Sequence, residues 1–401
     1  MIQWIRKTSR RGNCVRYGAL IAYYLIYFVS TGLSSFLSKY YAEIGMSDGK
    51  IGMLMSVPTM LALLFMPLMG ALSDRVSKKR YLLAAQLILM AISCVLFPRC
   101  KTFAGMFLAV MGYSIFSVSV TPLATTISLE YCAEANKPFG VIRMSGTVGY
   151  QLGALLVGAL FTASLKNLYP MMAASMIVAC MATLFMPNIE GHQHKKARVP
   201  LKTLFADRHL RWLYGVIFFA TIGTQFHSAF FAKYLGDLGM SNREVSLITF
   251  LSTVPELPFL LLGDRIVKKI NVWNGILIGA ALSGARWIGL AVFKTFAPIM
   301  AVQIVAVSCM ACFEFIPAFY LNKRVRPEII GSAQTMLTLT TFGFGKIVGG
   351  LLGGWVCERA GIATVYVFNG AATLIGLIAL YKPTRRLIAE ESAQIRKESH
   401  L

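Results

Sequence analysis

Twelve apolar blocks, each close to 20 residues long, constrain this chain more than any other feature of its sequence. A helix needs about 20 apolar residues to cross the hydrocarbon core of a bilayer. The composition agrees, because 56% of the residues are hydrophobic and only 14% are charged, against about 25% charged in soluble domains. The sequence therefore predicts an all-α membrane protein with twelve transmembrane helices. The expected spans are residues 17–38, 50–72, 81–98, 103–127, 141–163, 168–187, 212–235, 245–263, 272–292, 297–320, 330–356 and 361–381.

The basic residues are distributed unevenly between the loops that these spans define. The N-terminal tail, the loops after even-numbered spans and the C-terminal tail carry 27 of the 39 Lys and Arg residues, whereas the remaining 12 lie in the other loops or within the spans. Such a bias is typical of loops that stay in the cytoplasm. We therefore expect a multi-pass protein of the plasma membrane with both termini cytoplasmic. The net charge of +22 then reflects orientation beside anionic lipid rather than nucleic-acid binding.

A polar segment near the middle of the chain separates six expected spans from six. It contains His192 and His194 among several basic residues, so it is either a solvated cytoplasmic linker or, less in keeping with its composition, a metal-binding tract. The C-terminal tail has mixed charge with Leu and Ile, which predicts a short cytoplasmic surface helix. The expected organisation is an N-terminal six-helix bundle at 1–187, a linker at 188–211, a C-terminal six-helix bundle at 212–381 and a tail at 382–401.

The two halves repeat a short motif directly after the second and the eighth expected spans. The motif reads Gly70-x-x-x-Asp74-Arg75-x-x-Lys78-Lys79 in the first half and Gly263-Asp264-Arg265-x-x-Lys268-Lys269 in the second. Internal repetition is typical of transporter folds. The first copy resembles the loop 2–3 signature of the major facilitator superfamily, with Ser77 in place of the usual glycine. A generic basic loop is the alternative, and the duplicated Asp-Arg pair argues against it.

This resemblance implies two pseudo-symmetric six-helix bundles and a gating role for the loop residues. An Asp at a cytoplasmic helix end can accept hydrogen bonds from helix N-termini and basic side chains, which stabilises one conformational state. Loss of these contacts lets the other state form. The predicted gating residues are Gly70, Asp74, Arg75, Lys78, Lys79, Asp264 and Arg265.

Few charges fall deep within the expected spans, where each costs about 2.5–3.5 kcal/mol. Such charges need a reason to persist, so we expect them to face one water-filled cavity and to pair there, although any single one could be structural. These charges are Arg143, Arg286, Lys346, Glu256 and Glu314, with Glu130 at the cytoplasmic end of a span.

The sequence around these charges resembles the lactose permease-like branch of the superfamily, the proton-linked symporters of sugars, nucleosides and aromatic acids. The resemblance covers nearly the whole chain and implies that Arg143 and Glu130 hold substrate hydroxyls. It also implies that Tyr150 stacks on the substrate, and seven residues place it about two turns from Arg143 on one helix face. The similar strings are Phe139-Gly-Val-Ile-Arg143-Met-Ser-Gly-Thr-Val-Gly-Tyr150, Glu256-Leu-Pro258, Ser283-Gly-Ala-Arg286-Trp287 and Phe344-Gly-Lys346.

In the second half, the resemblance implies that Glu256, Arg286, Glu314 and Lys346 take part in proton coupling. Glu256 would also contact substrate. A carboxylate in a low-dielectric cavity holds a proton more readily than one in water, which suits proton carriage. Prolines flank Glu256 on both sides and free backbone carbonyls there, as is typical of helices that line cavities.

The sequence departs from the branch at the partners of these residues. The helix 10 His of the branch has no counterpart, because Ala306 or Ala311 stands in its place. Two helix 7 Asp positions are occupied by Thr224 and His227, so the usual acidic partners of Lys346 are missing from them. His227 either replaces one of these polar contacts, as a substrate ligand, or is an ordinary packed residue.

These features favour proton-coupled uptake of a small polar organic solute, either a sugar, an oligosaccharide or a nucleoside, by alternating access. A proton-coupled drug or metabolite exporter is the alternative, but the Gly-Pro expected in helix 5 of such exporters is absent from the stretch 146–158. An enzyme is not expected, since the sequence has no metal-spaced His/Cys set, nucleophile motif or phosphate loop. The expected partners are the substrate, protons and the bilayer, with no cofactor, no metal and a monomeric state.

Glycines repeat at a spacing of four residues in two of the expected spans. Gly149 and Gly153 form one such pair, and Gly345, Gly349 and Gly353 form a longer series. Small residues at this spacing let helix backbones approach closely, so both stretches are predicted helix–helix contacts.

Overall fold

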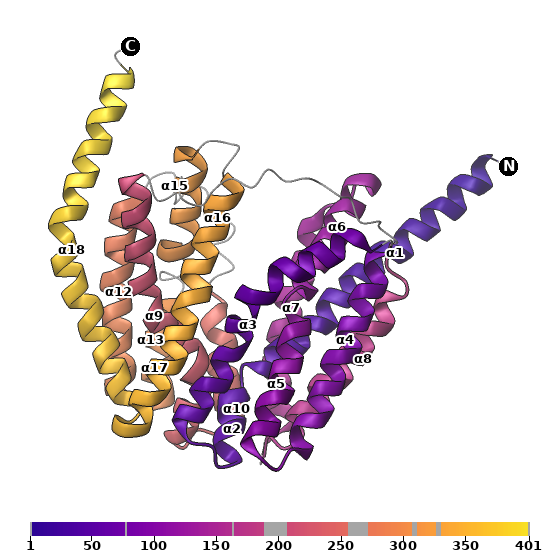
Figure 1. The fold of residues 1–401 in the computed structure, drawn as a ribbon, viewed down its shortest axis with the longest axis horizontal. Coiled ribbons are helices and arrows are strands. Elements are labelled where there is room, and N and C mark those ends of the chain that lie inside the picture. Colours follow the sequence, from indigo (N-terminus) through magenta and orange to yellow (C-terminus); the bar gives the residue numbers. More distant parts are fainter. Residues whose placement is uncertain are drawn as a thin grey trace. The chain divides into compact units, whose positions relative to one another are not determined.

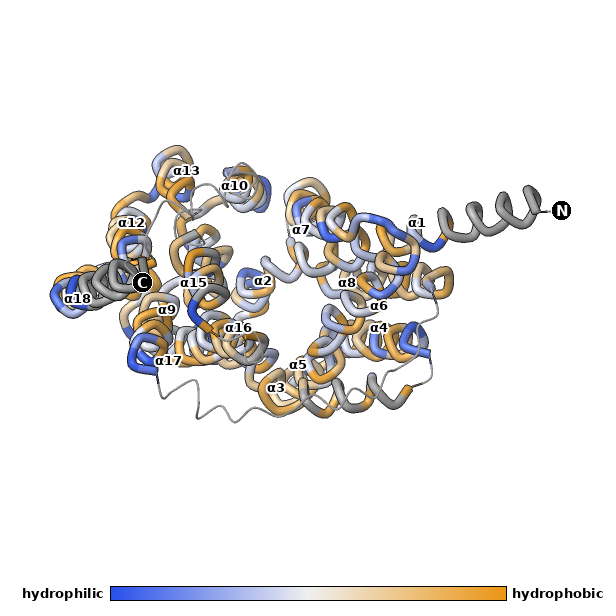
Figure 2. Tube along the Cα trace, turned by 90° about the horizontal axis from the view of Figure 1, so that it is seen from above, coloured by the Kyte–Doolittle hydropathy of each residue, from blue (hydrophilic) through white to orange (hydrophobic). Residues whose placement is uncertain are grey.

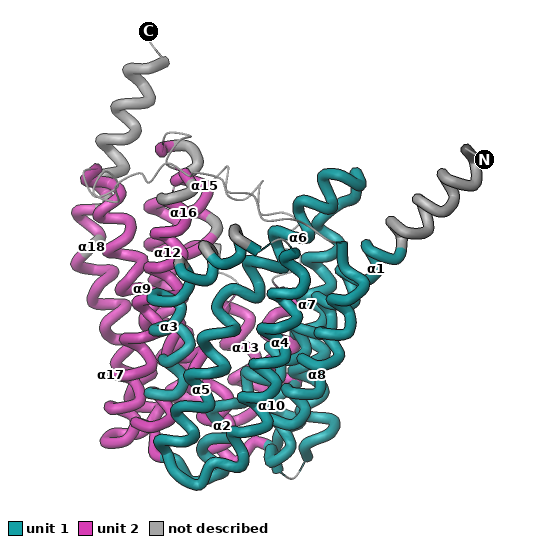
Figure 3. The backbone as a smooth tube through the Cα atoms, turned by 45° about the vertical axis from the view of Figure 1, so that its right-hand side comes forward, with its two compact units in different colours: residues 1–46, 53–196, 241–246 teal, residues 47–52, 197–240, 247–401 magenta. Residues whose placement is uncertain are grey.

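All regular elements in the described part of the chain are helices (Figure 1). The computed structural model describes residues 2–76, 78–162, 164–187, 207–255, 272–306, 311–325 and 330–399. The chain forms two compact units (Figure 3). Unit 1 comprises residues 1–46, 53–196 and 241–246, and unit 2 comprises residues 47–52, 197–240 and 247–401.

The helices follow the apolar blocks of the sequence. The first part of the chain forms α1 (Ile2–Ser34), α2 (Leu37–Glu43), α3 (Asp48–Arg75), α4 (Lys79–Leu96), the short 3-10 helix η1 (Phe97–Arg99), α5 (Phe103–Ser117), α6 (Val120–Ala135), α7 (Phe139–Leu160) and α8 (Leu168–Thr183). The second part forms α9 (Arg208–Asp237), α10 (Asn242–Thr253), α12 (Val272–Val292), α13 (Phe296–Ile304), the π-helical turn η3 (Ala311–Phe315), α15 (Ile316–Arg324), α16 (Ile330–Thr338), the π-helical stretch η5 (Leu339–Phe344), α17 (Gly345–Ala360) and α18 (Ile362–Ser399).

The positions of these helices confirm the prediction of an all-helical membrane protein. The ninth expected span is identical in its bounds to α12, and α3 and α7 each begin two residues before the predicted start. Eight helices of the described chain are long and apolar enough to cross a membrane. Two shorter apolar helices, Leu168–Thr183 and Cys312–Leu321, accompany them. The count of twelve spans stays a prediction.

Prolines account for two interruptions within expected spans. The fourth span is divided into α5 and α6, because Pro122 has no N–H to donate to the carbonyl of Val118. The tenth span contains the π-helical turn η3 shortly before Pro317, which likewise cannot donate to the carbonyl of Phe313. Single π-helical turns of this kind are frequent at functional sites.

The C-terminal tail is helical and continues the last expected span. Helix α18 continues from Ile362 through Pro383 to Ser399 without a break. One proline removes a single backbone hydrogen bond, and the residues that follow are mainly Leu, Ile, Ala, Glu, Arg and Lys, which sustain a helix well.

The spaced glycines lie where helix backbones meet, as predicted. A Cβ atom on Gly149 or Gly153 of α7 would collide with the carbonyl oxygens of Leu25 and Val29 in α1. A Cβ atom on Gly349 of α17 would lie 2.9 Å from the carbonyl oxygen of Ile222 in α9. The glycine spacing therefore sets the packing of α7 on α1 and of α17 on α9.

Large apolar side chains are exposed along the helices of both units, and the tube view shows hydrophobic residues over much of their length (Figure 2). In unit 1 they include Leu64 and Leu108, and in unit 2 Phe219, Leu352 and Ile378. Soluble proteins rarely expose apolar surface on this scale. These exposed apolar surfaces are therefore suited to contact with the hydrocarbon core of a bilayer.

Candidate functional site

Arg143 provides the charged group of a candidate site in unit 1. Its exposed guanidinium lies over the ring of Phe28 in α1, 5.5 Å from the ring centroid. The Phe28 ring stacks on Tyr24, whose hydroxyl lies 3.2 Å from the Thr125 hydroxyl of α6. Both rings lie close to Gly146, where a Cβ atom would be 3.1 Å from Phe28 and 3.3 Å from Tyr24. A cation beside aromatic faces and hydroxyl groups can bind a polar solute that also has an apolar face.

The other two predicted substrate ligands of unit 1 are placed differently. Tyr150 is half-buried on α7, two turns after Arg143. Glu130, at the end of α6, accepts a hydrogen bond of 2.9 Å from the buried ammonium group of Lys79 in α4. The structure therefore brings Glu130 together with a lysine of the loop motif, and this ion pair joins the ends of α4 and α6.

The remaining loop-motif residues are placed by the end of α3 and the start of α4. Gly70, Asp74 and Arg75 lie in the last turns of α3. Lys78 is exposed, with its ammonium group 5.7 Å from the centroid of the Tyr81 ring. Three predicted site residues, Glu256, Asp264 and Arg265, lie outside the described residues.

A buried polar cluster in unit 2 is centred on Arg286 of α12, which is only 5% exposed. Its Nε and Nη2 atoms donate to the side-chain oxygen of Gln303 in α13 at 2.9 and 2.8 Å. Nη2 also lies 2.9 Å from Nε2 of His227 in α9. The other ring nitrogen, Nδ1, lies 2.9 Å from the Tyr366 hydroxyl of α18. Four helices thus contribute one polar side chain each.

The geometry of this cluster defines the state of the histidine. A guanidinium group can only donate, so Nε2 of His227 must accept and carry no proton. Nδ1 then carries the hydrogen and donates to the hydroxyl of Tyr366. His227 is therefore neutral while it contacts Arg286, and binding of a proton at Nε2 requires that contact to break.

Sequence reasoning did not identify Gln303 as part of the site. An amide is uncharged, so it was not among the charges that mark functional positions inside spans. The available signal was a polar side chain in an otherwise apolar helix, Phe296–Ile304. In the structure, Gln303 of α13 accepts a hydrogen bond from Arg286. It lies close in sequence to Ala306 and Ala311, the positions considered for the missing helix 10 histidine.

Two more predicted coupling residues lie at π-helical segments. Glu314 is half-buried within the turn η3, and Lys346 is half-buried on α17 directly after η5. A π-helical turn shifts the following side chains around the helix and leaves a backbone carbonyl less well paired. Both charges therefore lie where the helix surface is irregular.

Unit 2 also contains an ion pair that the sequence did not indicate. Asp207, which caps the N-terminus of α9, accepts a hydrogen bond of 2.9 Å from Arg324 at the end of α15. Burial alone would raise the pKa of Asp207, but the hydrogen bonds from Arg324 and the His209 amide lower it overall. The pair joins the first turn of α9 to the last turn of α15.

The described residues contain no group of three or more His, Cys, Asp or Glu side chains able to hold a metal ion. The polar groups described at these positions are guanidinium, imidazole, amide and hydroxyl groups, with aromatic rings beside them.

Comparison with known proteins gives one consistent family. The model of the MFS_1 like family matches residues 17–368. The chain is 26% identical to the maltose permease of Geobacillus stearothermophilus over 91% of this chain and 93% of that protein. It is 25% identical to the nucleoside permease NupG of Escherichia coli (strain K12), over 77% of this chain and 78% of that protein.

The fold agrees with a solved transporter. The crystal structure of nucleoside transporter NupG superimposes with a TM-score of 0.82 at 21% identity, covering 91% of this chain and 99% of that chain. These relatives are membrane transporters and not enzymes, as the sequence predicted. The chain belongs to the MFS_1 like family of the major facilitator superfamily, with the fold of a multi-pass membrane transporter.

Proposed function

We propose that this protein takes up a small polar solute, a sugar, an oligosaccharide or a nucleoside, together with protons by alternating access. The names of the maltose and nucleoside permeases support this range of substrates. In the proposal both termini and the linker are cytoplasmic, and the protein acts as a monomer in the cytoplasmic membrane.

The observation that carries the proposal is the position of Arg143. It is an exposed cation within a predicted span, beside the stacked rings of Phe28 and Tyr24. An ionisable residue within a transmembrane segment is expected to serve a ligand or a water-filled path. We assign substrate hydroxyls to Arg143 and an apolar face of the substrate to the neighbouring aromatic rings, including Tyr150.

Proton coupling is assigned to Glu256, Glu314, Arg286 and Lys346. The contact between Arg286 and His227 supports this assignment, because it is compatible only with neutral His227. A proton entering the cluster would release Arg286 from the histidine. The gating role is assigned to the loop motif, whose Lys79 forms an ion pair with Glu130 of α6.

The test is uptake by the full chain in proteoliposomes with an imposed pH gradient, using maltose and a set of nucleosides. Arg143→Gln should reduce uptake about 10- to 100-fold, since hydrogen bonds to charged groups contribute about 1.5–3 kcal/mol. Arg99→Gln is the matched control, because Arg99 is an exposed arginine of unit 1 whose described hydrogen bond goes to the nearby backbone carbonyl of Val95. Uptake that survives Arg143→Gln would refute the binding assignment.

Coupling is tested separately with Glu256→Gln. This variant should lose accumulation against a gradient, since the amide cannot release a proton. Normal accumulation by Glu256→Gln and by Glu314→Gln would exclude proton symport through these groups. Extrusion of solute in place of uptake would support the exporter alternative.

A further inference from the structure

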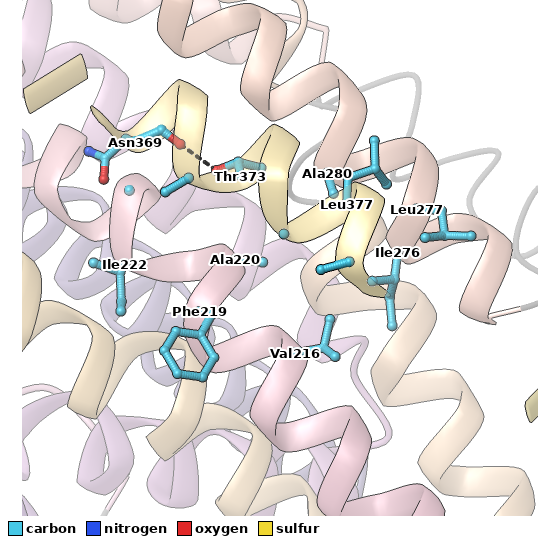
Figure 4. A pocket seen from close by; sticks show the side chains of 14 residues that line it. Val216, Phe219, Ala220, Ile222, Ile276, Leu277, Ala280, Asn369, Thr373 and Leu377 are labelled. Carbon is cyan, nitrogen blue, oxygen red and sulfur yellow. Dashed lines mark hydrogen bonds between the residues drawn. The ribbon is translucent and has the colours of Figure 1, made fainter. Parts of the chain in front are cut away.

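A cavity of about 390 Å³ lies between α9, α12 and α18 within unit 2 (Figure 4). Its described lining is apolar except for Asn369 and Thr373, and the Thr373 hydroxyl is already bonded to the Asn369 carbonyl. Gly376 of α18 borders open space, because nothing lies within 4 Å of the place where its Cβ would be.

The cavity opens on an exposed apolar surface of unit 2. Phe219, one of the lining residues, is 72% exposed, and Ile378, which stands between the lining residues Leu377 and Ala379 of α18, is 76% exposed. Along α18 the cavity extends from Asn369 to Ala379. Ten residues of helix rise about 15 Å, which is half of the roughly 30 Å hydrocarbon core. The groove therefore has the length of the acyl region of one leaflet.

Basic side chains follow the apolar groove on two of its three helices. Arg386 lies seven residues after the lining residue Ala379, about two turns along the same face of α18. Arg208 lies eleven residues before Phe219, about three turns along the same face of α9. Both arginines are exposed. The acidic neighbour of Arg208, Asp207, is already bonded to Arg324.

We propose that this groove binds one phospholipid with an anionic headgroup, in the leaflet on the side of Arg208 and Arg386. One acyl chain occupies the groove between α9, α12 and α18, and the phosphate group contacts the two arginines. A chain without a charged head would match only the groove, and a free phosphate would match only the arginines. The combination of an apolar groove one leaflet long with a basic end selects an anionic lipid.

The acyl part is tested with purified full-length protein in detergent, titrated with phosphatidylglycerol and monitored by native mass spectrometry and thermal melting. The wild type should retain one phosphatidylglycerol and melt at a higher temperature with it. Gly376→Phe fills the groove and should lose both effects. Gly215→Phe is the matched control, since Gly215 is an α9 glycine with open space around it that does not line the groove. Retention of the lipid by Gly376→Phe would refute the site.

The headgroup part is tested with the double variant Arg208→Gln, Arg386→Gln and with phosphatidylcholine as the neutral lipid. Each basic residue near a lipid surface contributes about fivefold in affinity, equivalent to about 1 kcal/mol. The double variant should therefore bind phosphatidylglycerol about 30-fold more weakly and no longer prefer it to phosphatidylcholine. Equal binding of the two lipids by the wild type would show a non-selective boundary lipid and overturn the proposal. If Gly376→Phe does not melt cooperatively, Ala280→Leu fills the same groove from α12.

Discussion

Two segments of the chain, residues 45–52 and 239–246, share a backbone structure but differ in the side chain that follows it. Both begin Gly-Met-Ser, and their glycines have φ angles of 82° at Gly45 and 81° at Gly239. In each, the amide of the following methionine, Met46 or Met240, donates back to a carbonyl of the preceding helix at 3.0 Å. The same helix-ending turn therefore occurs in both halves of the sequence.

The next position separates the two segments. Asp48 of the first segment forms an ion pair with Lys233 at 3.0 Å within unit 2, and Lys233 also pairs with Asp237. Asn242 of the second segment donates instead to the backbone carbonyl of Phe161 within unit 1. A repeated turn can thus be used once for a charged contact and once for a neutral one. The two contacts differ in the residue type at this position and in the neighbour that it faces.

The largest effect is expected from making the second segment resemble the first. Asn242 is only 4% exposed, and its side-chain amide donates to the carbonyl oxygen of Phe161. Asn242→Asp replaces this amide with a carboxylate, which cannot donate to that oxygen. Burial of an unpaired charge should destabilise the protein by about 3 kcal/mol or more at pH 8.

A protonated carboxyl could still donate to that carbonyl, so the new group would bind its proton more tightly in the folded state. The protonated, stabilising form of this carboxyl is present at low pH and lost as the pH rises. The loss of stability caused by Asn242→Asp should therefore be smaller at pH 5 than at pH 8. Thermal melting at both pH values measures this, with Asn242→Ala as the uncharged control. A defect that is equal at both pH values would contradict the assignment.

Breaking the charged contact should give the next largest effect. Lys233→Met leaves Asp48 and Asp237 without their shared cation and should destabilise unit 2 by about 2 kcal/mol. Addition of Asp48→Asn to this variant should recover part of the loss, because the uncompensated carboxylate is removed. Lys294→Met is the control lysine, since Lys294 bonds only the Tyr234 hydroxyl among the contacts described for it. Equal losses in the two lysine variants would mean that the ion pair has no specific role.

The shared turn predicts equal effects in the two segments. Gly45→Ala and Gly239→Ala should each cost about 1 kcal/mol, because a side chain is disfavoured at positive φ. Neither position has an atom within 4 Å of the added Cβ, so packing does not contribute. Asparagine, which tolerates this conformation better, should cost less at both positions. Unequal losses would show that the two turns are not equivalent.

The sequence predicted the elements that depend on local pattern and missed those that depend on tertiary contacts. Apolar block length located α12 to the residue, and glycine spacing located the contact of α7 with α1. The contact of Glu130 with Lys79, which lies 51 residues earlier, was not indicated by the sequence. Gln303 was missed because only the approach of α13 to α12 brings it to Arg286.

The smallest effect concerns a capping interaction that only the second segment has. Ser241 and Glu244 form a reciprocal capping box, in which the Glu244 carboxylate accepts from the amide and hydroxyl of Ser241 at 2.9 and 2.8 Å. The matching position of the first segment is Lys50, which cannot accept these bonds. Glu244→Ala should therefore cost about 0.5 kcal/mol through loss of the cap, whereas Lys50→Ala removes no such cap. The bonds from Ser241 lower the pKa of Glu244 below its ordinary value of 4.5. The stabilisation is thus complete above pH 4.5 and is lost as the pH falls through the lowered pKa, so the difference between wild type and Glu244→Ala in thermal melting should disappear in acid. A difference that persists unchanged in acid would show that Glu244 acts through its bulk and not through its charge.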